Sequence, residues 1–493
     1  MKVKNLRWIV LSLIALVTII NYLDRGTLNY MWMVNQRNSY AIVDKPMEGS
    51  YSACVDQTTS SYTLYNKDSE VVATISSAEV VRNSDGTIEY ITKGGIAYDL
   101  GLIDPTSSPD EQQSQGKEIL ALITMCFMVA YGVSQLVSGK IYDKIGTRKG
   151  FALSVIIWGA ADAFTSMASG IKSLIGFRMG LGLGEAGPWP GTTKSNAEWF
   201  PTNERALAQG VFGAAASFGG ILAPIAIPIL FIAFGWRVTF IIVGSLGVLW
   251  VIPWLVINKK APKGHPWITD EEHDYIISGQ PECEATCVKG KSWGELLRDR
   301  RNYSVILGRF FIDPIWWMFV TWLPIYLMEV FGLDIKEIAA SAWVPYVGAA
   351  VGSLSGGWFS GKLIQMGKSV NFARKCAISI GAIITLPAMA LAAMASSATS
   401  AVVLMAFILG GFQFMIANIQ TIACDLHSGK TVGSLAGLGG ASAVLGVLIT
   451  MYLVPSITAG GNWILFFAMG GSLIPLSLLS VFLCARKIES IED

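Results

Sequence analysis

Apolar runs long enough to cross a lipid bilayer recur along almost the whole chain, and they constrain its fold more than any other feature. A helix needs about 20 mainly apolar residues to cross the roughly 30 Å hydrocarbon core. Twelve runs of the 493-residue chain are long enough. The pattern predicts an all-α membrane protein with twelve transmembrane helices in two halves of six. The runs extend over residues 8–33, 117–137, 150–169, 171–193, 206–233, 236–257, 303–330, 338–364, 373–396, 400–423, 432–455 and 461–484.

Composition agrees with this class of protein and excludes several others. Hydrophobic residues make up 52% of the chain and charged residues only 14%, whereas soluble domains are about a quarter charged. The net charge of +1 gives no support for nucleic-acid binding. Seven cysteines without CxxC pairs or metal-type spacing, and only three histidines, argue against a disulfide framework or a zinc site. No phosphate-binding loop or nucleophile–base set appears, so we expect neither an enzyme nor a bound cofactor.

Basic residues gather in alternate short loops and indicate how the chain is oriented. Lysine and arginine favour the cytoplasmic side of membrane proteins. The distribution predicts a protein of the cell inner (plasma) membrane with both termini in the cytoplasm. The N-terminus is basic and then apolar without a small-residue cleavage site, which predicts a retained first span. The cytoplasmic clusters are Lys2, Lys4 and Arg7, then Lys140, Lys144, Arg148 and Lys149, then Lys259, Lys260 and Lys263, then Lys362, Lys368, Arg374 and Lys375, and finally Arg486 and Lys487.

Two polar segments lie outside the predicted spans and divide the chain. Residues 34–116 form a long insertion on the outer side, between the first and second spans. Short strands are expected at Val80–Arg82 and Thr87–Ile91, on either side of a turn at 83–86, so we predict a small β-rich extracytoplasmic cap. Cys54 is its only cysteine, which rules out an internal disulfide.

The second segment, residues 258–302, is predicted to be a cytoplasmic linker between an N-terminal half (1–257) and a C-terminal half (303–493). Within it, Thr269 is placed to cap a short helix that has Glu272 at its third position.

Ionisable residues interrupt two of the apolar runs. Arg178 and Glu185 lie in the fourth run, nearly two helical turns apart, so both occupy one helix face about 10 Å apart along the axis. Asp24 and Arg25 lie late in the first run, at a depth that matches Arg178. Charge inside a bilayer is costly and marks a functional candidate. The pattern predicts one group of four charges; a purely structural Arg178–Glu185 ion pair is the alternative.

The loop after the second run carries the motif Gly139–x3–Asp143–x2–Gly146–x–Arg148–Lys149. An aspartate at a helix end can pair with a cation or cap a neighbouring helix, and so hold the cytoplasmic face in one state. A basic loop that only sets the topology is the alternative. A looser copy follows the eighth run, and repeated halves are typical of transporters whose substrate site lies between them.

This motif resembles the signature loop of the major facilitator superfamily and matches it at every fixed position. The resemblance implies that Gly139, Asp143 and Arg148 form a conformational gate. Within that superfamily the chain resembles the anion:cation symporters and, among these, the bacterial hexuronate transporters. This resemblance extends over nearly the whole chain except residues 34–116. The segments that carry it are Asn21–Tyr22–Leu23–Asp24–Arg25, Arg178…Glu185 with Pro190, Ala197–Glu198–Trp199–Phe200–Pro201, Thr269–Gln280, Arg309–Trp316 and Lys336–Ala339.

The resemblance also assigns roles to the buried charges. It implies that Asp24 and Glu185 couple transport to protons, that Arg25 binds the substrate and that Arg178 organises the coupling network. The chemistry agrees, because arginine stays charged and its planar fork suits a carboxylate. A coupling carboxylate must bind and release a proton within the physiological pH range, as a buried one can.

Further candidates carry weaker signals, each with a structural alternative. Tyr22 and Tyr131 would offer hydroxyls and rings to a sugar, or else lie at the membrane interface. Lys194 would bind the anion in an inward-facing state, or else extend to the interface. The polar residues of the tenth run would contact substrate hydroxyls, or else bond to neighbouring helices; these are Asn418, Gln420 and Thr421. Arg309 and Asp313 are expected to form a local pair.

Together these features predict a proton-coupled importer of a sugar acid, with a hexuronate such as glucuronate or galacturonate favoured. Another organic anion, such as an aldonate or a dicarboxylate, and anion exchange without proton coupling are the alternatives. The expected partners are the small anionic sugar, protons and the lipid bilayer, without nucleic acid, and the protein is expected to be a monomer.

Overall fold

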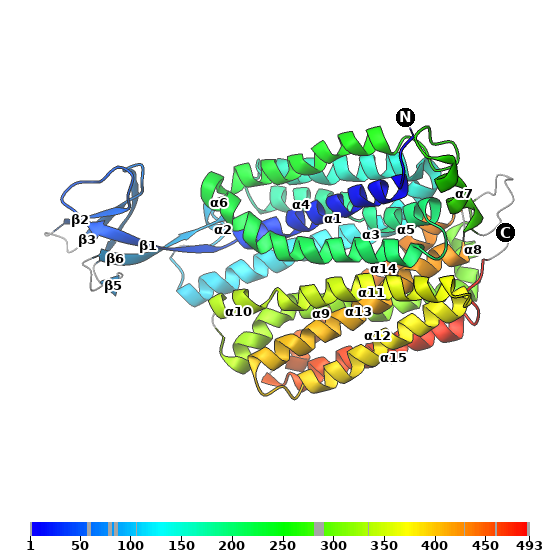
Figure 1. Cartoon of the computed structure of the whole chain (residues 1–493). Coiled ribbons are helices and arrows are strands. Elements are labelled where there is room, and N and C mark those ends of the chain that lie inside the picture. Colours follow the sequence, from blue (N-terminus) through cyan, green and yellow to red (C-terminus); the bar gives the residue numbers. More distant parts are fainter. Residues whose placement is uncertain are drawn as a thin grey trace. The chain divides into compact units, whose positions relative to one another are not determined.

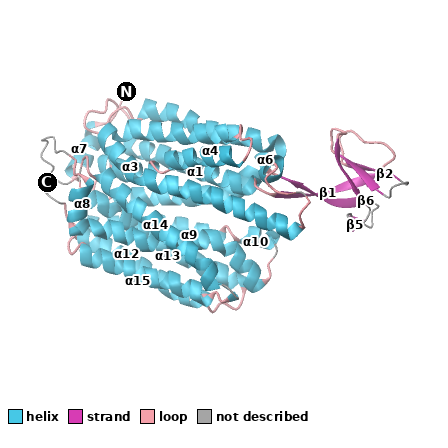
Figure 2. Cartoon of the chain, turned by 180° about the vertical axis from the view of Figure 1, so that it is seen from behind, coloured by secondary structure: helices cyan, strands magenta, loops and turns pink. Residues whose placement is uncertain are grey.

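The structure is a computed structural model that describes residues 2–56, 61–76, 81–82, 87–104, 106–280, 290–333, 335–427, 429–458 and 461–490. The chain folds into two compact units. The helical unit comprises Met1–Thr27, Leu122–Ala168 and Lys172–Asp493, and the smaller unit comprises Leu28–Ala121 with Ser169–Ile171. Most described residues are helical, and the named strands form one sheet (Figure 2).

Among the described residues, eight helices are long and apolar enough to cross a membrane. Two of the eight contain a sharp turn, because Gly146 (φ 80°) and Gly235 (φ 73°) adopt backbone angles that favour glycine and separate two consecutive helices. The main helices are α1 (Leu6–Met31), α3 (Pro109–Thr165), α4 (Ile171–Glu185), α5 (Pro188–Trp199), α6 (Arg205–Ile257), α9 (Tyr303–Phe331), α10 (Ile335–Ser341), α11 (Val344–Gln365), α12 (Val370–Ala392), α13 (Ala398–Leu426), α14 (Val432–Thr458) and α15 (Ile464–Cys484).

The fourth and eighth predicted runs are each interrupted, which the sequence pattern missed. The fourth run is split into α4, which ends at Glu185, and α5, which begins at Pro188. Proline has no N–H to continue the helical hydrogen bonds, and its ring clashes with the preceding turn. The eighth run is split in the same way before Pro345. The break in the fourth run places Glu185 at a helix end.

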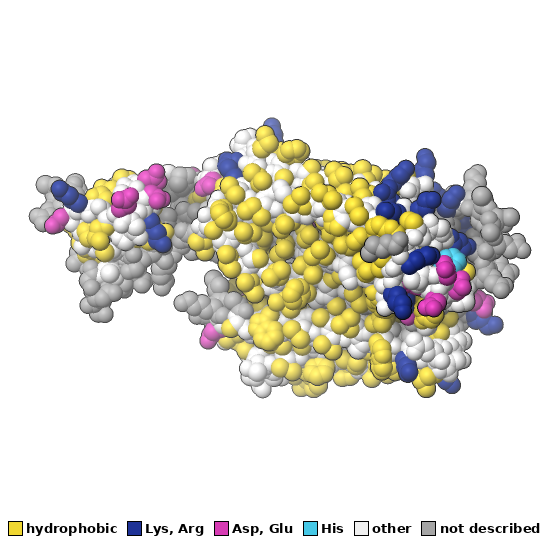
Figure 3. All heavy atoms as spheres, turned by 45° about the horizontal axis from the view of Figure 1, so that its top comes forward, with side chains coloured by type: hydrophobic (Ala, Val, Ile, Leu, Met, Phe, Trp, Pro, Cys, Tyr) yellow, Lys and Arg dark blue, Asp and Glu magenta, His cyan; other side chains and the backbone are white. Residues whose placement is uncertain are grey.

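The outer surface of the helical unit is apolar over most of its length. Figure 3 shows hydrophobic side chains spread over the bundle, with lysine and arginine gathered near the end that carries α7 (Asp270–Ser278). Ile232 on α6 exposes 74% of its surface, and Ile229 and Ile252 on the same helix are also exposed. Helices satisfy their own backbone hydrogen bonds, so such a surface is stable against hydrocarbon.

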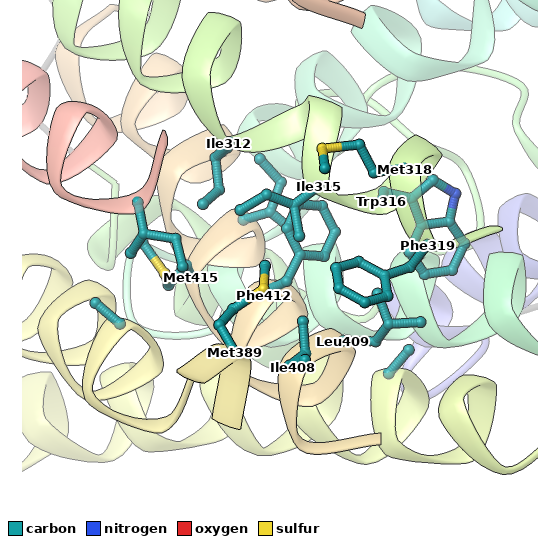
Figure 4. Packing of buried hydrophobic residues seen from close by; sticks show 14 of the residues in the cluster. Ile312, Ile315, Trp316, Met318, Phe319, Met389, Ile408, Leu409, Phe412 and Met415 are labelled. Carbon is teal, nitrogen blue, oxygen red and sulfur yellow. The ribbon is translucent and has the colours of Figure 1, made fainter. Parts of the chain in front are cut away.

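Inside the bundle, small residues and apolar side chains bring the helices together. Figure 4 shows the cluster formed by α9, α12 and α13, in which Phe319, Met389 and Phe412 lie close to one another. Gly352 of α11 lies against the backbone of Gly410 of α13, where a Cβ atom would collide. Close backbone approach of this kind is the usual basis of helix packing in membranes.

The linker and both termini lie at the same end of the helical unit (Figure 1). The backbone N–H of Val3 donates to Trp267 O at 2.7 Å, and Ile488 N–H donates to Asn371 Oδ1 at 3.1 Å. As predicted, the Thr269 side chain accepts a hydrogen bond from the N–H of Glu272 and caps α7. Glu272 in turn accepts from the N–H groups of Leu6 and Arg7 at the start of α1.

The smaller unit contains a six-stranded sheet with strand order β4-β3-β2-β1-β6-β5. Only the β1–β2 pair is parallel among the described ladders. The predicted β character of the insertion is confirmed, whereas Val80 and the turn at 83–86 lie outside the described residues. Tyr40, Ala53, Tyr62, Leu64 and Ile88 form its core. The strands are β1 (Val34–Ile42), β2 (Ser52–Asp56), β3 (Ser61–Tyr65), β4 (Val71–Ser76), β5 (Val81–Arg82) and β6 (Thr87–Gly94).

Candidate functional site

A cavity in the helical unit is lined by residues from both predicted halves of the chain. Most of its lining is apolar or aromatic, with a few polar and charged side chains, which is the usual composition of a small-molecule site. Its charged lining residues are Arg25, Arg309 and Asp313. Further lining residues include Tyr22, Tyr131, Gln135, Trp189, Gln209, Trp316, Trp317, Gln413 and Gln420.

Arg25 of α1 is the basic residue that the N-terminal half contributes to this cavity. Its Nε and Nη2 donate to Glu185 Oε2 at 3.0 and 2.9 Å. The rings of Tyr22 and Tyr131 lie 5.2 and 5.3 Å from the guanidinium carbon. Glu185 is fully buried, and its Oε1 has no hydrogen-bond partner among the described residues. The partner of Glu185 is therefore Arg25, and not Arg178 of its own helix.

A second group of charges is buried away from the cavity lining. Asp24 of α1 and Asp162 of α3 are fully buried, and Arg178 of α4 is nearly so. Asp24 lies within electrostatic reach of Asp162, Glu185 and Arg178. The indole of Trp158 lies beside Asp24 without forming a well-aligned hydrogen bond. Burying charged groups is costly unless they compensate one another. The structure brings together the four predicted residues, Asp24, Arg25, Arg178 and Glu185. Asp162 is a fifth charged residue in the same group.

Sequence reasoning missed Asp162. It is the one acidic residue in the apolar run 150–169, and a charge in such a run is a functional candidate by itself. That signal was present, but Asp162 has no charged neighbour at helical spacing to draw attention to it.

The C-terminal half contributes a second arginine–carboxylate pair to the cavity. Arg309 Nη2 donates to Asp313 Oδ2 at 2.7 Å within α9, which confirms the predicted local pair. The spacing alone did not show that both side chains line the same cavity as Arg25.

The weaker candidates separate into two groups. Tyr22, Tyr131 and Gln420 line the cavity, and Gln420 Oε1 accepts a hydrogen bond from Gln209 Nε2. Asn418 and Thr421 are outside the lining: the Asn418 amide donates to Gly356 O at 3.1 Å, and the Thr421 hydroxyl donates to Ala417 O at 2.7 Å. Asn418 therefore bonds to the neighbouring helix α11, which was the alternative, whereas Thr421 bonds to the backbone of its own helix α13.

At the end of the bundle where the linker lies, Asp143 joins α3 to the start of α14. Its carboxylate accepts from the N–H groups of Gly433 and Ser434 at 3.0 and 2.6 Å, and Lys194 Nζ lies 3.1 Å from its Oδ1. A carboxylate at a helix N-terminus is favoured by the helix dipole. Lys194 is thus part of this contact and not of the cavity lining. Arg148 donates to Leu255 O at 3.1 Å.

A second ionic contact lies between the same halves. Asp425 of α13 accepts from Arg374 Nε at 2.8 Å, and Arg205 Nη1 lies 3.6 Å from its Oδ1. Arg205 also donates to Cys424 O at 2.8 Å. We refer to Asp143, Lys194, Gly433, Ser434, Arg205, Arg374 and Asp425 as the clamp.

Comparison with known proteins identifies the family. The model of the Major Facilitator Superfamily matches residues 91–373. The chain belongs to the major facilitator superfamily. Members are membrane transporters and not enzymes, so this chain is a multi-pass membrane transporter. Among the described residues, no cluster of three or more histidine, cysteine, aspartate or glutamate side chains could hold a metal ion.

Three relatives within the superfamily carry names that state a substrate. The "Hexuronate transporter" of Escherichia coli (strain K12) is 32% identical over 362 residues, covering 72% of this chain and 81% of the relative. The "Galacturonate transporter" of Dickeya chrysanthemi is 33% identical, covering 63% of this chain and 91% of the relative. A "Probable galactarate/D-glucarate transporter" of Escherichia coli (strain K12) is 28% identical, covering 75% and 87%.

Gly139 lies against Gly433 of the clamp, and replacing it tests whether this contact keeps the clamp closed. A Cβ atom at Gly139 would collide with the carbonyl oxygen of Gly433, so Gly139→Ala is expected to push α3 away from α14. Overpacking of this kind costs about 1–3 kcal/mol, which favours the open clamp by at least about fivefold. The native Cys424 is buried beside the clamp, so its labelling rate by a thiol reagent should rise by the same factor, as measured by mass spectrometry.

Gly176→Ala is the matched control for Gly139→Ala. Gly176 lies in α4, and a Cβ atom there meets nothing within 4 Å. Equal labelling of Cys424 in both alanine variants would show that the Gly139 contact does not keep the clamp closed.

Proposed function

We propose that this chain is a proton-coupled importer of a sugar acid, favouring a hexuronate such as glucuronate or galacturonate. The main support for this proposal is Arg25, which lines the cavity and whose guanidinium is held by the buried carboxylate of Glu185. An arginine is the group of choice for a substrate carboxylate. The names of the hexuronate and galacturonate relatives support the same substrate class.

Coupling follows from competition for Arg25. While Glu185 is ionised, it occupies two of the donors of Arg25 at 3.0 and 2.9 Å. A proton on Glu185 weakens this pair, and the guanidinium is then available to the substrate carboxylate. Proton and sugar acid therefore bind together, as symport requires. Asp24 and Arg178 complete the coupling group, in electrostatic reach of Glu185.

Alternating access requires the two halves to move about the cavity. In the proposed arrangement, a monomer crosses the inner (plasma) membrane with twelve spans, and its linker and both termini face the cytoplasm. α3 and α6 each supply two spans, on either side of Gly146 and Gly235. The clamp then closes the cytoplasmic side, with Gly139, Asp143 and Arg148 as the gate, and must open to release the substrate.

Asp162 is a further member of the coupling group, since it lies within electrostatic reach of Asp24. Asp162→Asn removes a negative charge near Asp24, so Asp24 loses one like-charged neighbour within the coupling group. The pH profile of uptake is expected to move to lower pH, because the negative charge that opposed ionisation of the coupling group is gone. Substrate affinity should change little, because Asp162 does not line the cavity.

Proton-driven uptake measured between pH 5 and 8 tests the Asp162 prediction. Asp270→Asn serves as the control, because Asp270 is exposed and ion-paired with Lys2 outside the bundle. A profile for Asp162→Asn that coincides with the wild type would exclude Asp162 from the coupling group.

Uptake into proteoliposomes tests the proposed function as a whole. Purified protein is supplied with glucuronate, galacturonate, an aldonate and a dicarboxylate, with and without an inward proton gradient. We expect the gradient to concentrate the hexuronates. Counterflow without any gradient-driven accumulation would instead identify an anion exchanger, and accumulation of another anion alone would reassign the substrate.

A further inference from the structure

The Arg309–Asp313 pair lines the cavity and retains unused hydrogen-bonding capacity. Both side chains line it, with only 8% and 15% of their side-chain surfaces exposed. The pair uses Arg309 Nη2 and Asp313 Oδ2. Among the described residues, Arg309 Nε and Asp313 Oδ1 are buried without a hydrogen-bond partner. A buried ion pair contributes little net stability compared with apolar packing, so stability alone does not explain this pair.

A third polar side chain lines the cavity near this pair and comes from the other half of the chain. Gln135 of α3 lines the cavity, and its Oε1 is likewise buried without a partner among the described residues. A Cβ atom placed on Gly440 would touch both Gln135 Oε1 and Arg309 Nη1, so these two side chains border the same small volume. Tyr22 lies within electrostatic reach of both Arg25 and Asp313, which links the two charged pairs to one cavity.

The free atoms distinguish between two kinds of ligand. Arg309 Nε is a donor, whereas Asp313 Oδ1 and Gln135 Oε1 are acceptors. A sugar hydroxyl donates and accepts, so neighbouring hydroxyls can satisfy all three atoms. A carboxylate only accepts: it would leave both acceptors unpaired and would place a second negative charge against Asp313. Unpaired buried polar groups are a strong basis for rejecting a ligand.

We infer that Arg309, Asp313 and Gln135 form the subsite for the hydroxyl-bearing end of the substrate and select against a second carboxylate. This inference rests on the proposed function, in which Arg25 holds the one carboxylate of the sugar acid. The protein then prefers sugar acids with a single carboxylate, the uronates and aldonates, to aldarates, which carry a carboxylate at both ends. Asp313 is the residue that sets this preference.

Competition binding to the purified full-length protein tests the subsite. Radiolabelled glucuronate is displaced by unlabelled glucuronate, gluconate or glucarate, which share a six-carbon chain and differ in their ends. For the wild type we expect glucarate to bind at least tenfold more weakly than glucuronate. Asp313→Asn replaces the carboxylate by an amide of the same shape and should reduce that ratio at least fivefold. Asp274→Asn, on an exposed carboxylate of α7, is the matched control and should leave the ratio unchanged.

A second variant distinguishes loss of the subsite from loss of folding. Arg309→Lys keeps the charge but loses the planar fork, and it should weaken glucuronate and gluconate together, with an elution profile on gel filtration like that of the wild type. An unchanged ratio in Asp313→Asn, or a wild type that prefers glucarate, would overturn the inference while leaving the sugar-acid transporter in place. Absence of any sugar-acid binding by folded wild type would overturn the proposed function as well. The assay needs no proton gradient, so a failure of coupling alone does not affect it.

Discussion

Replacing Arg25 by alanine is expected to weaken sugar-acid binding by about two to three orders of magnitude. Truncating one partner of a buried, hydrogen-bonded charge pair costs about 2–5 kcal/mol, and each 1.4 kcal/mol is about tenfold in affinity. The guanidinium is the only basic group that the N-terminal half supplies to the cavity lining among the described residues. Equilibrium binding of radiolabelled glucuronate to the purified protein measures the loss.

Two further variants separate binding from stability. Arg25→Ala leaves the fully buried Glu185 without its partner, and an uncompensated buried charge can cost about 3–5 kcal/mol of stability. The double variant Arg25→Ala with Glu185→Gln removes that charge and should fold, but should bind the sugar acid as weakly as Arg25→Ala. Arg301→Ala breaks a partly exposed arginine–carboxylate pair, with Asp299, outside the cavity and serves as the control. Wild-type affinity in the double variant would remove Arg25 from the substrate site.

Glu185→Gln is expected to abolish accumulation driven by a proton gradient while preserving exchange of substrate across the membrane. A pH difference of one unit stores about 1.4 kcal/mol per proton, so one-to-one symport can concentrate the substrate about tenfold. Glutamine has nearly the shape of glutamate but cannot exchange a proton, and it leaves the Arg25 fork available to substrate. The accumulation ratio in proteoliposomes should therefore fall from about ten to about one.

Counterflow provides the necessary internal control for Glu185→Gln. Liposomes preloaded with unlabelled glucuronate should still take up the labelled compound, because exchange needs no net proton movement. Glu271→Gln removes an exposed glutamate from the start of α7 and should leave both assays unchanged. If Glu185→Gln still concentrated glucuronate against a gradient, the coupling role would have to pass to Asp24 or Asp162.

The charged residues show how far sequence patterns extend. Helical spacing placed Arg178 and Glu185 on one face, and matching depth grouped them with Asp24 and Arg25. The structure brings these four residues together but pairs Glu185 with Arg25, 160 positions away in the chain. Spacing along one helix cannot reveal that pairing, because it depends on how α1 is rotated against α4. Asp162 was missed for the same reason: its charged neighbours lie on other helices.

Local sequence features determine the helices and strands, whereas contacts between distant helices determine the cavity. Apolar length, proline and glycine positions and capping residues act through backbone hydrogen bonds and local hydrophobicity. The sequence by itself therefore determined the long apolar helices, apart from the breaks in the fourth and eighth runs, together with the β-rich insertion and the Thr269 cap. The cavity depends on which faces of distant helices meet, and close packing at residues such as Gly352 and Gly139 sets those faces. Only the tertiary structure could decide that Arg309 and Asp313, a local pair by spacing, face the same cavity as Arg25.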